Sequence, residues 1–501
     1  MSARPPKPAV LKHVLVPPSS PERFAAVLDA AGAAQLHSLI ADARAALHGR
    51  VVWNVNSTAR GGGVAEILGS LIGYSRGAGI DARWVVIGGE QDFFTVTKRL
   101  HNHLHGSAGD GGELGATERA IYEHTLAASA AELHKLVRPR DVVLLHDPQT
   151  AGLVEAVVSR GAVAIWRCHV GLDLANERAR EAWAFLHRYV LAADAYVFSR
   201  AEFAWEGLSR EKVEVIAPSI DPFSPKNAQL EEATVASILS ASEIVATRAD
   251  GAPVFERSDG SPGRVDRIAE KVEDQPLSPA DRIVLQVSRW DRLKDPVGVL
   301  LGFAEYVAGR SADAHLVLAG PTATEVADDP EGIEVWRETV AARAALDPER
   351  RSRIHLLSLP MLDPEENAVI VNALQRAATI VVQKSLAEGF GLTVAEAMWK
   401  SKPIVAAAVG GIQDQVLDGE TGLLLESSRD ARMFGEAVCR LLEDPALAAR
   451  MGAAGHERVR AHYLGPRHLG QFLSLIQREL AAHERAARPA PRQRAADADA
   501  H

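Results

Sequence analysis

The stretch KSLAEGFGLTVAEAMWKSKPIVAAAVGG, residues 384–411, decides how this chain is organised. It follows the apolar run ATIVVQ (378–383) and passes through a glycine-containing loop into a helical pattern that begins near Leu392. The next apolar run, PIVAAAVGG (403–411), completes the order strand, helix, strand. This order predicts a parallel βαβ unit, with the loop at the carboxyl end of its first strand.

The same alternation of short apolar runs and longer helical stretches extends along the chain. Runs of strand length occur in a first series at 51–56, 82–89, 141–146, 162–169 and 195–199, and in a second series at 281–290, 314–320, 354–359, 378–385 and 403–411. Two separate series predict an α/β protein with two doubly wound, Rossmann-like parallel-sheet domains that face each other across a cleft. Ligands of such sheets bind in the loops at the carboxyl ends of the strands.

Five segments are expected from this pattern. Residues 1–220 form the N-terminal domain, 281–465 form the C-terminal domain, and the charged, glycine- and proline-containing stretch within 221–280 is an insertion or hinge. We expect a helix at 466–483 that packs back toward the N-terminal domain, followed by a disordered Ala/Arg/Pro-rich tail at 484–501.

Composition limits the class of protein. The 501 residues suggest roughly two to four domains, and 47% hydrophobic with 24% charged residues is typical of a globular chain. A formal net charge of −10 argues against a surface that binds nucleic acid non-specifically. The chain has two cysteines, no apolar run long enough to span a membrane, and no signal-peptide pattern, so we expect a soluble cytoplasmic protein without a disulfide framework.

The loop Glu388-Gly389-Phe390-Gly391 and the helix after it form a candidate anion site. Backbone N–H groups in the first turn of a helix lack internal partners and carry partial positive charge, and glycines let an anion approach them closely. Glu388 in the loop and Glu396 in the helix can accept hydrogen bonds from sugar hydroxyls. The alternative is a helix whose acidic residues only complement its dipole.

Two cations, Arg289 and Lys294, follow a strand end in the same half of the chain. Beside an anion site at a helix terminus, they could neutralise a diphosphate leaving group without a metal. A solvated charged loop is the alternative interpretation. The coincidence of this loop with the acidic motif in one domain favours a diphosphate site.

The first series of strands offers weaker candidates. A glycine triplet (61–63) lies at a strand-to-helix turn, but it does not fit the dinucleotide fingerprint, and tight packing would also explain it. His146 and His169 each end a predicted strand, with Asp147 and Asp173 close to them in the sequence. Such a histidine could hydrogen-bond a sugar hydroxyl or polarise a reacting group, although a structural histidine is the commoner case.

Two stretches that resemble metal motifs do not lead us to predict a metal. The run HNHLH (101–105) lacks accompanying cysteines or suitably spaced carboxylates. The pair Asp497 and Asp499 matches the metal-binding carboxylates of some nucleotide-sugar enzymes, but it lies in the expected tail. We therefore predict that the chemistry needs no metal.

The second-domain motif resembles that of the retaining glycosyltransferases of family 4, which have the two-domain GT-B fold. The resemblance is carried by Glu388 and Glu396 with seven residues between them, by the basic pair Arg289 and Lys294, and by GGIQDQVLDGETGLLL (410–425). It extends from about residue 50 to about residue 465.

A narrower resemblance comes from the first domain, which is similar to trehalose glycosyltransferring synthases and to the longer retaining trehalose phosphorylases. The segments that carry it are WNVNSTARGGGVAEIL (53–68), LHDPQTAGL (145–153), WRCHVGLD (166–173) and PSIDPFSPKN (218–227). Between the two families, the resemblance to the synthases is the closer one.

These resemblances imply roles for particular residues. Arg289 and Lys294 would hold the donor diphosphate, Glu388 the transferred glucose and Glu396 the ribose. The sugar and the distal phosphate would contact the backbone of Gly389, Phe390, Gly391 and Leu392. From the first domain, Gly62 and Gly63 would close over the donor, and His169 would join Arg289, Lys294 and Glu388 at the reacting centre. The implied acceptor pocket contains His101, Asp147 and Asp173.

The activity implied by the resemblance is reversible transfer of glucose, with retention, from a nucleoside-diphosphate glucose to free glucose, giving α,α-trehalose. No cofactor is required for this chemistry, stimulation by Mg²⁺ stays open, and a homodimer is implied. Neither nucleic acid nor a membrane is an expected partner. The alternatives are a trehalose phosphorylase that uses glucose 1-phosphate and phosphate, and a family 4 glycosyltransferase with another acceptor.

Overall fold

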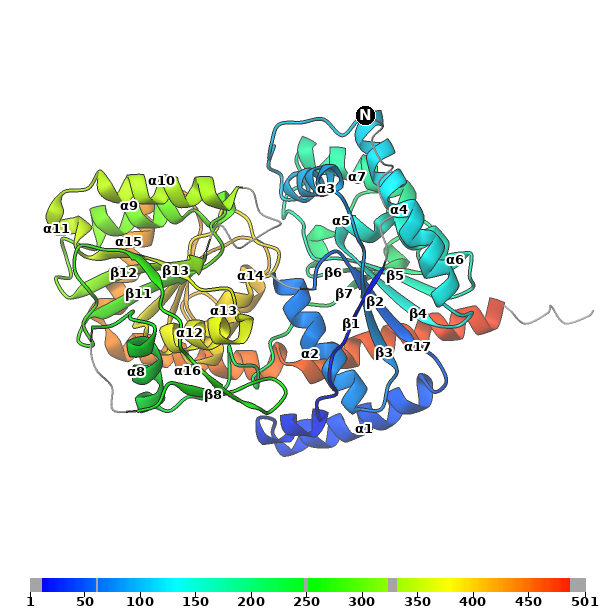
Figure 1. Ribbon diagram of the computed structural model, residues 1–501, viewed down its shortest axis with the longest axis horizontal. Helices are drawn as coiled ribbons and strands as arrows, with labels where there is room; N and C mark the ends of the chain where they lie inside the picture. Colours follow the sequence, from blue (N-terminus) through cyan, green and yellow to red (C-terminus); the bar gives the residue numbers. More distant parts are fainter. Residues whose placement is uncertain (1–10, 60–61, 247–250, 323–330, 487–501) are drawn as a thin grey trace, which may run out of the picture.

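The computed structural model describes residues 11–59, 62–246, 251–322 and 331–486, and they contain two α/β domains, each built on a seven-stranded sheet (Figure 1). This confirms the prediction of two doubly wound, Rossmann-like domains. Gly61, Asp497, Asp499 and the rest of 487–501 lie outside the described residues, whereas residues 484–486, expected to begin the disordered tail, belong to the last helix.

The first sheet has the strand order β1-β3-β2-β4-β5-β6-β7. Its strands are β1 (Lys12–Val14), β2 (Val52–Asn56), β3 (Ala82–Val86), β4 (Val142–His146), β5 (Val163–Cys168), β6 (Ala195–Phe198) and β7 (Val213–Val215). All neighbours are parallel except β1, which pairs antiparallel with β3 at the edge. The sequence analysis missed the two three-residue edge strands, because such short runs carry no clear periodicity.

The second sheet has the strand order β10-β13-β12-β11-β14-β15-β16. Its strands are β10 (Glu270–Val272), β11 (Arg282–Val287), β12 (Ala314–Pro321), β13 (Ile354–Leu359), β14 (Ile380–Gln383), β15 (Ile404–Ala407) and β16 (Leu423–Leu425). Only β10 runs antiparallel, again at an edge. The central strands are buried along almost their whole length, as expected of a sheet with helices on both faces.

Helices pack on both faces of each sheet (Figure 1). The first domain has α1 (Ala30–Ala46), α2 (Gly63–Gly77), α3 (Gln91–Leu104), α4 (Ala116–Leu136), α5 (Asp147–Thr150), α6 (Val154–Val158) and α7 (Glu177–Val190). The second has α8 (Glu232–Ala241), α9 (Pro296–Tyr306), α10 (Gly332–Ala344), α11 (Pro348–Arg351), α12 (Pro364–Ala377), α13 (Leu392–Trp399), α14 (Ile412–Gln415), α15 (Ala431–Glu443) and α16 (Pro445–His462). Among the described residues, no helix combines the length and the apolar character needed to cross a membrane.

Strand order reverses at one place in each sheet. In the second sheet β11 pairs with β12 on one side and with β14 on the other, so the connections that leave β11 and β14 diverge. In the first sheet the same reversal lies between β2 and β4. Ligands of open α/β sheets bind at such switch points, beyond the carboxyl ends of the strands.

The segment between the two series of strands contains α8, the hairpin strands β8 (Val254–Glu256) and β9 (Pro262–Arg264), and β10. Ion pairs fasten its hairpin region to α12: Arg257 contacts Asp363 and Glu365, and Arg267 contacts Glu366. Glu366 also accepts hydrogen bonds of 2.7 Å from the backbone N–H groups of Asp266 and Arg267. The segment thus extends the second domain around α12.

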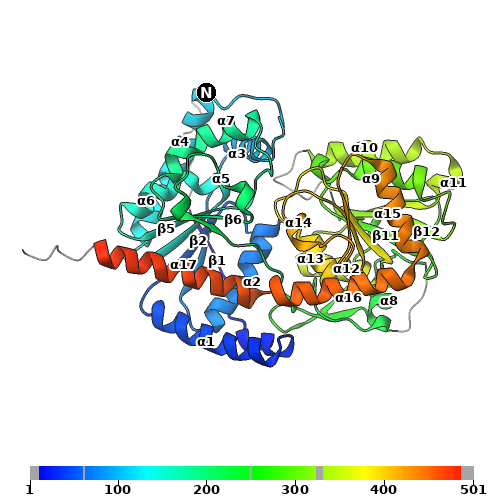
Figure 2. The same ribbon diagram turned by 180° about the vertical axis from the view of Figure 1, so that it is seen from behind.

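The last helix, α17 (Gly465–Ala486), leaves the second domain and lies against the first (Figure 2). It contacts α1 and β5, and Arg467 donates to the carbonyls of Ala217 and Pro218. Farther along, His483 pairs with Asp194 at 2.8 Å. One continuous stretch of chain therefore fastens the two domains together.

The α12 contacts generate a stability prediction. Replacing Glu366 by Ala removes a buried acceptor from two backbone N–H groups, and we expect the free energy of unfolding to fall by about 2–3 kcal/mol. Trypsin should then cleave faster at Arg257 and Arg264, and thermal unfolding should begin earlier. The control is Glu270→Gln, an exposed carboxylate of the same segment. Equal cleavage rates in both variants would contradict the assignment.

Candidate active site

Two loops at the switch point of the second sheet are joined to one another. The backbone N–H of Leu386, after β14, donates to the carbonyl of Leu293, after β11, at 2.7 Å. Lys384 pairs with Asp295, and Lys294 pairs with Glu388. The side chains of Lys294 and Glu388 are largely buried, so this pair lies in a partly desolvated environment.

The helix α13 begins beside this pair. Gly391 precedes it with a φ of +90°, a left-handed conformation that favours glycine. A Cβ on Gly389 would lie 2.5 Å from the carbonyl oxygen of His169, so only glycine permits this approach of the two domains. Gly63, at the start of α2, lies against Leu392. Both domains therefore meet at the first turn of α13 (Figure 1).

Arg289 lies on the same side of the second sheet and ion-pairs with Asp291 at 3.3 Å. Burial acts to raise the pKa of Asp291, but the charges of Arg289, Lys294 and Lys98 outweigh it and hold that pKa below its ordinary value. The side chain of Arg289 is about two-fifths exposed. Positive charge therefore gathers at this loop, with one group still open to solvent.

Two histidines near the end of α3 face this cationic region. Burial, together with the charges of Lys98, Arg289 and Lys294, lowers the pKa of His101 well below its ordinary value. His105 lies 4.9 Å from His101 between ring centroids, and its Nδ1 contacts the carbonyl of Gly171 at 3.1 Å. Burial lowers the pKa of His105 to about 4. Both rings are thus neutral donors or acceptors beside the cations.

Glu396 lies one to two turns into α13, and its side chain is buried. Lys226 approaches one of its oxygens at 3.7 Å and also pairs with Glu66 of α2 at 2.5 Å. The other oxygen, Oε2, makes no hydrogen bond of ordinary geometry to the described residues. A groove of about 990 Å³ is lined by Lys226, the partner of Glu396, and by Gly62, Glu66 and Leu392. It is large enough for a nucleoside.

Both ring nitrogens of His169 have hydrogen-bond partners. Its Nδ1 lies 3.4 Å from Nε of Arg167, and its Nε2 lies 3.2 Å from Nδ1 of His146. The carboxylate of Asp147 accepts the His169 backbone N–H at 2.7 Å, and burial raises the pKa of Asp147 to about 7. Through these contacts, the main chain of His169 faces α13 while its ring belongs to the wall of the first domain.

Asp173 spans the cleft. Its carboxylate accepts hydrogen bonds from the Gly410 N–H at 2.9 Å and the Gln413 side chain at 3.0 Å, and it pairs with Arg200 at 2.9 Å. Arg200 in turn donates to the Gly410 carbonyl. This cluster joins the loop after β5 to the loop after β15.

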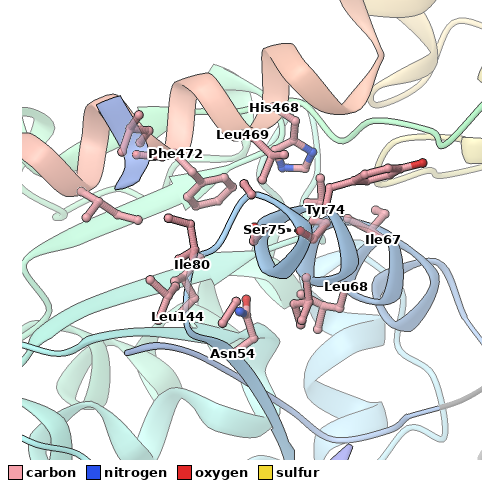
Figure 3. A pocket seen from close by; sticks show the side chains of 18 of the residues that line it. Asn54, Ile67, Leu68, Tyr74, Ser75, Ile80, Leu144, His468, Leu469 and Phe472 are labelled. Carbon is pink, nitrogen blue, oxygen red and sulfur yellow. Dashed lines mark hydrogen bonds between the residues drawn. The ribbon is translucent and has the colours of Figure 1, made fainter. Parts of the chain in front are cut away.

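An apolar cavity of about 120 Å³ lies where α17 packs on the first domain (Figure 3). Side chains from α1, α2, α17 and the first sheet enclose it, among them Leu68, Leu144 and Phe472. Its polar lining includes His146, His169, Arg167 and His468. It is separate from the charged site described above.

The structure thus brings Lys294, Glu388 and the Gly389–Leu392 backbone together, with Arg289 and His101 within electrostatic range. His169 and Gly63 reach the same place from the first domain, whereas Gly62 lines the groove and Glu396 is connected to it through Lys226. Sequence reasoning missed His105, Lys226 and Arg200. The first lies in the HNHLH run, of which the sequence analysis selected only His101 as a site residue. Among the described residues, no group of three or more His, Cys, Asp or Glu is arranged to hold a metal ion.

Comparison with known proteins identifies the two domains. Residues 54–205 match the family model "Trehalose synthase, N-terminal domain", and residues 268–458 match "Glycosyl transferases group 1". The chain is 37% identical over 435 residues to the trehalose synthase of Pyrococcus horikoshii. This alignment covers 86% of this chain and 90% of the relative. The chain is 24% identical over 420 residues to the trehalose phosphorylase of Pleurotus pulmonarius. That alignment covers 79% of this chain and 52% of the relative.

The solved α,α-trehalose-phosphate synthase (UDP-forming) of Burkholderia vietnamiensis superposes with a TM-score of 0.63 at 15% identity, covering 86% of this chain and 99% of that chain. This likeness confirms the GT-B fold. The two family matches lie in different domains and include Arg289, Lys294, Glu388 and Glu396, whereas the segment 218–227 lies between them. The chain therefore belongs to the trehalose synthase family of glycosyltransferases.

Proposed function

We propose that this enzyme transfers glucose, with retention, from a nucleoside-diphosphate glucose to free glucose and forms α,α-trehalose reversibly. The observation that carries the proposal is the Lys294–Glu388 pair at the start of α13. A cation, a carboxylate and a helix N-terminus converge there, and these are the groups that a glucose diphosphate ester needs. Membership in the trehalose synthase family supports the choice of product.

The donor is proposed to lie along the second domain. Its diphosphate contacts Arg289, Lys294 and the backbone N–H groups from Gly389 to Leu392, with Phe390 and Gly391 between them. Its glucose takes the place of Lys294 as a partner of Glu388, and its ribose donates to Glu396, whose Oε2 lacks an ordinary hydrogen bond. Gly62 and Gly63 close over the donor from the first domain.

The acceptor is proposed to bind on the first-domain side, near His101 and the main chain of His169. Asp147 contributes by fixing the His169 backbone, and Asp173 by joining the two domains. Closure of the domains would exclude water, which otherwise competes with glucose as acceptor.

In the proposed reaction, the bond between C1 and the phosphate oxygen breaks and its electron pair leaves with the diphosphate. Arg289, Lys294 and the α13 N-terminus stabilise this growing negative charge, more in the transition state than in the ground state. An acceptor hydroxyl oxygen forms the new bond to C1 on the same face. Its proton passes to the departing phosphate oxygen, so the products are trehalose and a nucleoside diphosphate.

Trehalose phosphorylase is the second candidate, because a relative of that name also matches both halves of this chain. The two activities share the glucosyl transfer and differ in the leaving group, which is inorganic phosphate in the phosphorylase. The groove lined by Lys226, the ion-pair partner of Glu396, favours a nucleotide, since a phosphate donor would leave it unoccupied.

Product analysis distinguishes these activities. We expect free glucose with one or more of the adenosine, uridine and guanosine diphosphate glucoses to yield α,α-trehalose, identified by NMR of the two anomeric protons. Trehalose with a nucleoside diphosphate should release glucose, whereas trehalose with inorganic phosphate should not. Glucose release with phosphate alone would establish the phosphorylase instead.

Loss of either cation should slow the chemical step. We expect Lys294→Ala and Arg289→Ala to lower kcat by about 10²-fold or more, the usual cost of removing a group that stabilises a developing anion. The matched control is Arg292→Ala, because Arg292 lies between them in the sequence but pairs with Glu331, Glu334 and Glu338. A folded Lys294→Ala enzyme with normal kcat would contradict the assignment.

Removing the carboxylate of Glu396 should weaken donor binding. We expect Glu396→Gln to raise KM for the nucleotide donor by about tenfold with little change in kcat, as loss of uniform binding does. This increase in KM should disappear with a 2′,3′-dideoxy nucleotide donor, which has no ribose hydroxyl for Glu396 to bind. An equal increase in KM with both donors would contradict a contact between Glu396 and the ribose.

A further inference from the structure

A buried arginine lies behind the reaction site. Arg167, on β5, has a side chain that is almost completely buried, and no carboxylate of the described residues lies within ion-pairing distance of it. Its guanidinium contacts Nδ1 of His169 at 3.4 Å, Nε2 of His468 at 3.1 Å and the carbonyl of Ile216 at 3.3 Å. Two of its three partners are therefore imidazoles, an unusual arrangement for a buried cation.

The chemistry of the guanidinium fixes the direction of these hydrogen bonds. Arginine carries only N–H donors and stays protonated in proteins, so each imidazole nitrogen that faces Arg167 must be the acceptor. Nδ1 of His169 and Nε2 of His468 are then without a proton. Each of these rings, when neutral, carries its single proton on the other nitrogen.

The remaining contacts of these rings assign the other protons in the same way. His169, protonated at Nε2, donates to Nδ1 of His146 at 3.2 Å, so His146 is protonated at Nε2 and donates to Oδ1 of Asn54 at 3.2 Å. His468, protonated at Nδ1, donates to the hydroxyl of Ser219 at 2.8 Å. Each imidazole N–H of the three rings has an acceptor, and the chain of bonds runs outward from Arg167 in both directions.

The surroundings keep the three rings neutral. Burial, and then the charge of Arg167, lowers the pKa of His146 to about 3 and the pKa of His169 and His468 well below the ordinary value. Phe472 stacks on His468 and lies 5.1 Å from the Arg167 guanidinium carbon, beside the apolar cavity (Figure 3). The Asp147 carboxylate favours the charged form of Arg167 from beyond ion-pairing distance, and the aromatic face of Phe472 also stabilises the buried cation.

We propose that Arg167 sets a single tautomer on each of His146, His169 and His468, and that His468 is a positioning residue that holds Arg167 against His169. His468 belongs to α17, the helix that joins the second domain to the first. Because the His169 carbonyl lies against Gly389, the orientation of His169 sets the wall that faces α13. Only the kinetic consequence rests on the proposed function; the tautomers do not.

The tautomers are tested directly by NMR of the full-length protein labelled with ¹⁵N in its histidine rings. Protonated and unprotonated ring nitrogens have well-separated ¹⁵N shifts, and single substitutions assign the signals. We expect His169 and His146 to be neutral with the proton on Nε2, and His468 to be neutral with the proton on Nδ1. A proton on Nδ1 of His169, or a doubly protonated ring, would overturn the proposal.

The positioning role is tested with two variants of His468. His468→Phe keeps the aromatic stack but removes the acceptor, so the His169 signals should shift and kcat should fall by about tenfold, with less change in KM. His468→Gln supplies an oxygen acceptor and should restore kcat to within about twofold, as expected for a residue that acts through its hydrogen bond. The control is His483→Phe, which removes a histidine of the same helix that pairs with Asp194.

Unchanged His169 signals in His468→Phe would refute the coupling, and so would a His468→Gln enzyme as slow as His468→Phe. If the wild-type protein makes no trehalose under any donor, the proposed function fails, while the ¹⁵N spectra still decide the tautomers. If His468→Phe does not fold, the wild-type spectra and His468→Gln decide the outcome.

Discussion

β11 and β14 pair side by side although the segments that follow them leave in opposite directions, and this reversal places two loops at one edge of the second sheet. The hydrogen bond between Leu386 and Leu293 holds the loops in register. Lys294 and Glu388 meet for this reason, although they are far apart in the sequence. The N-terminus of α13 lies beside them because it follows directly from the second loop, so strand order alone concentrates the charges of the site.

The charges at the site are paired within the protein. Lys294 has Glu388, Arg289 has Asp291, and Lys226 lies between Glu66 and Glu396. The proposed diphosphate donor would compete for these cations and release the carboxylates to sugar hydroxyls. Such an exchange costs less than desolvating an unpaired charge, because each buried group keeps a partner before and after binding. It also links ligand binding to contacts between the domains, since Glu66 and Glu396 belong to different domains.

The C-terminal helix connects this chemistry to the rest of the chain. α17 leaves the second domain, packs on the first and places His468 on Arg167, directly behind His169. The cleft wall therefore includes a residue from the last helix of the described chain. Main-chain contacts such as that of His169 with Gly389 bring the domains close together, and the polar cluster of Asp173, Arg200 and Gly410 joins them at a second place.

The sequence by itself determined the strand series, the doubly wound domains and the loop that carries Glu388, because apolar periodicity and glycine placement are local properties. It also located Arg289 and Lys294 at a strand end. Only the tertiary structure decided that the His169 ring faces Arg167 and His146, that Asp173 spans the cleft, and that Lys226 approaches Glu396. Side-chain direction and ion pairing depend on which distant segments pack together, and no local pattern records that packing.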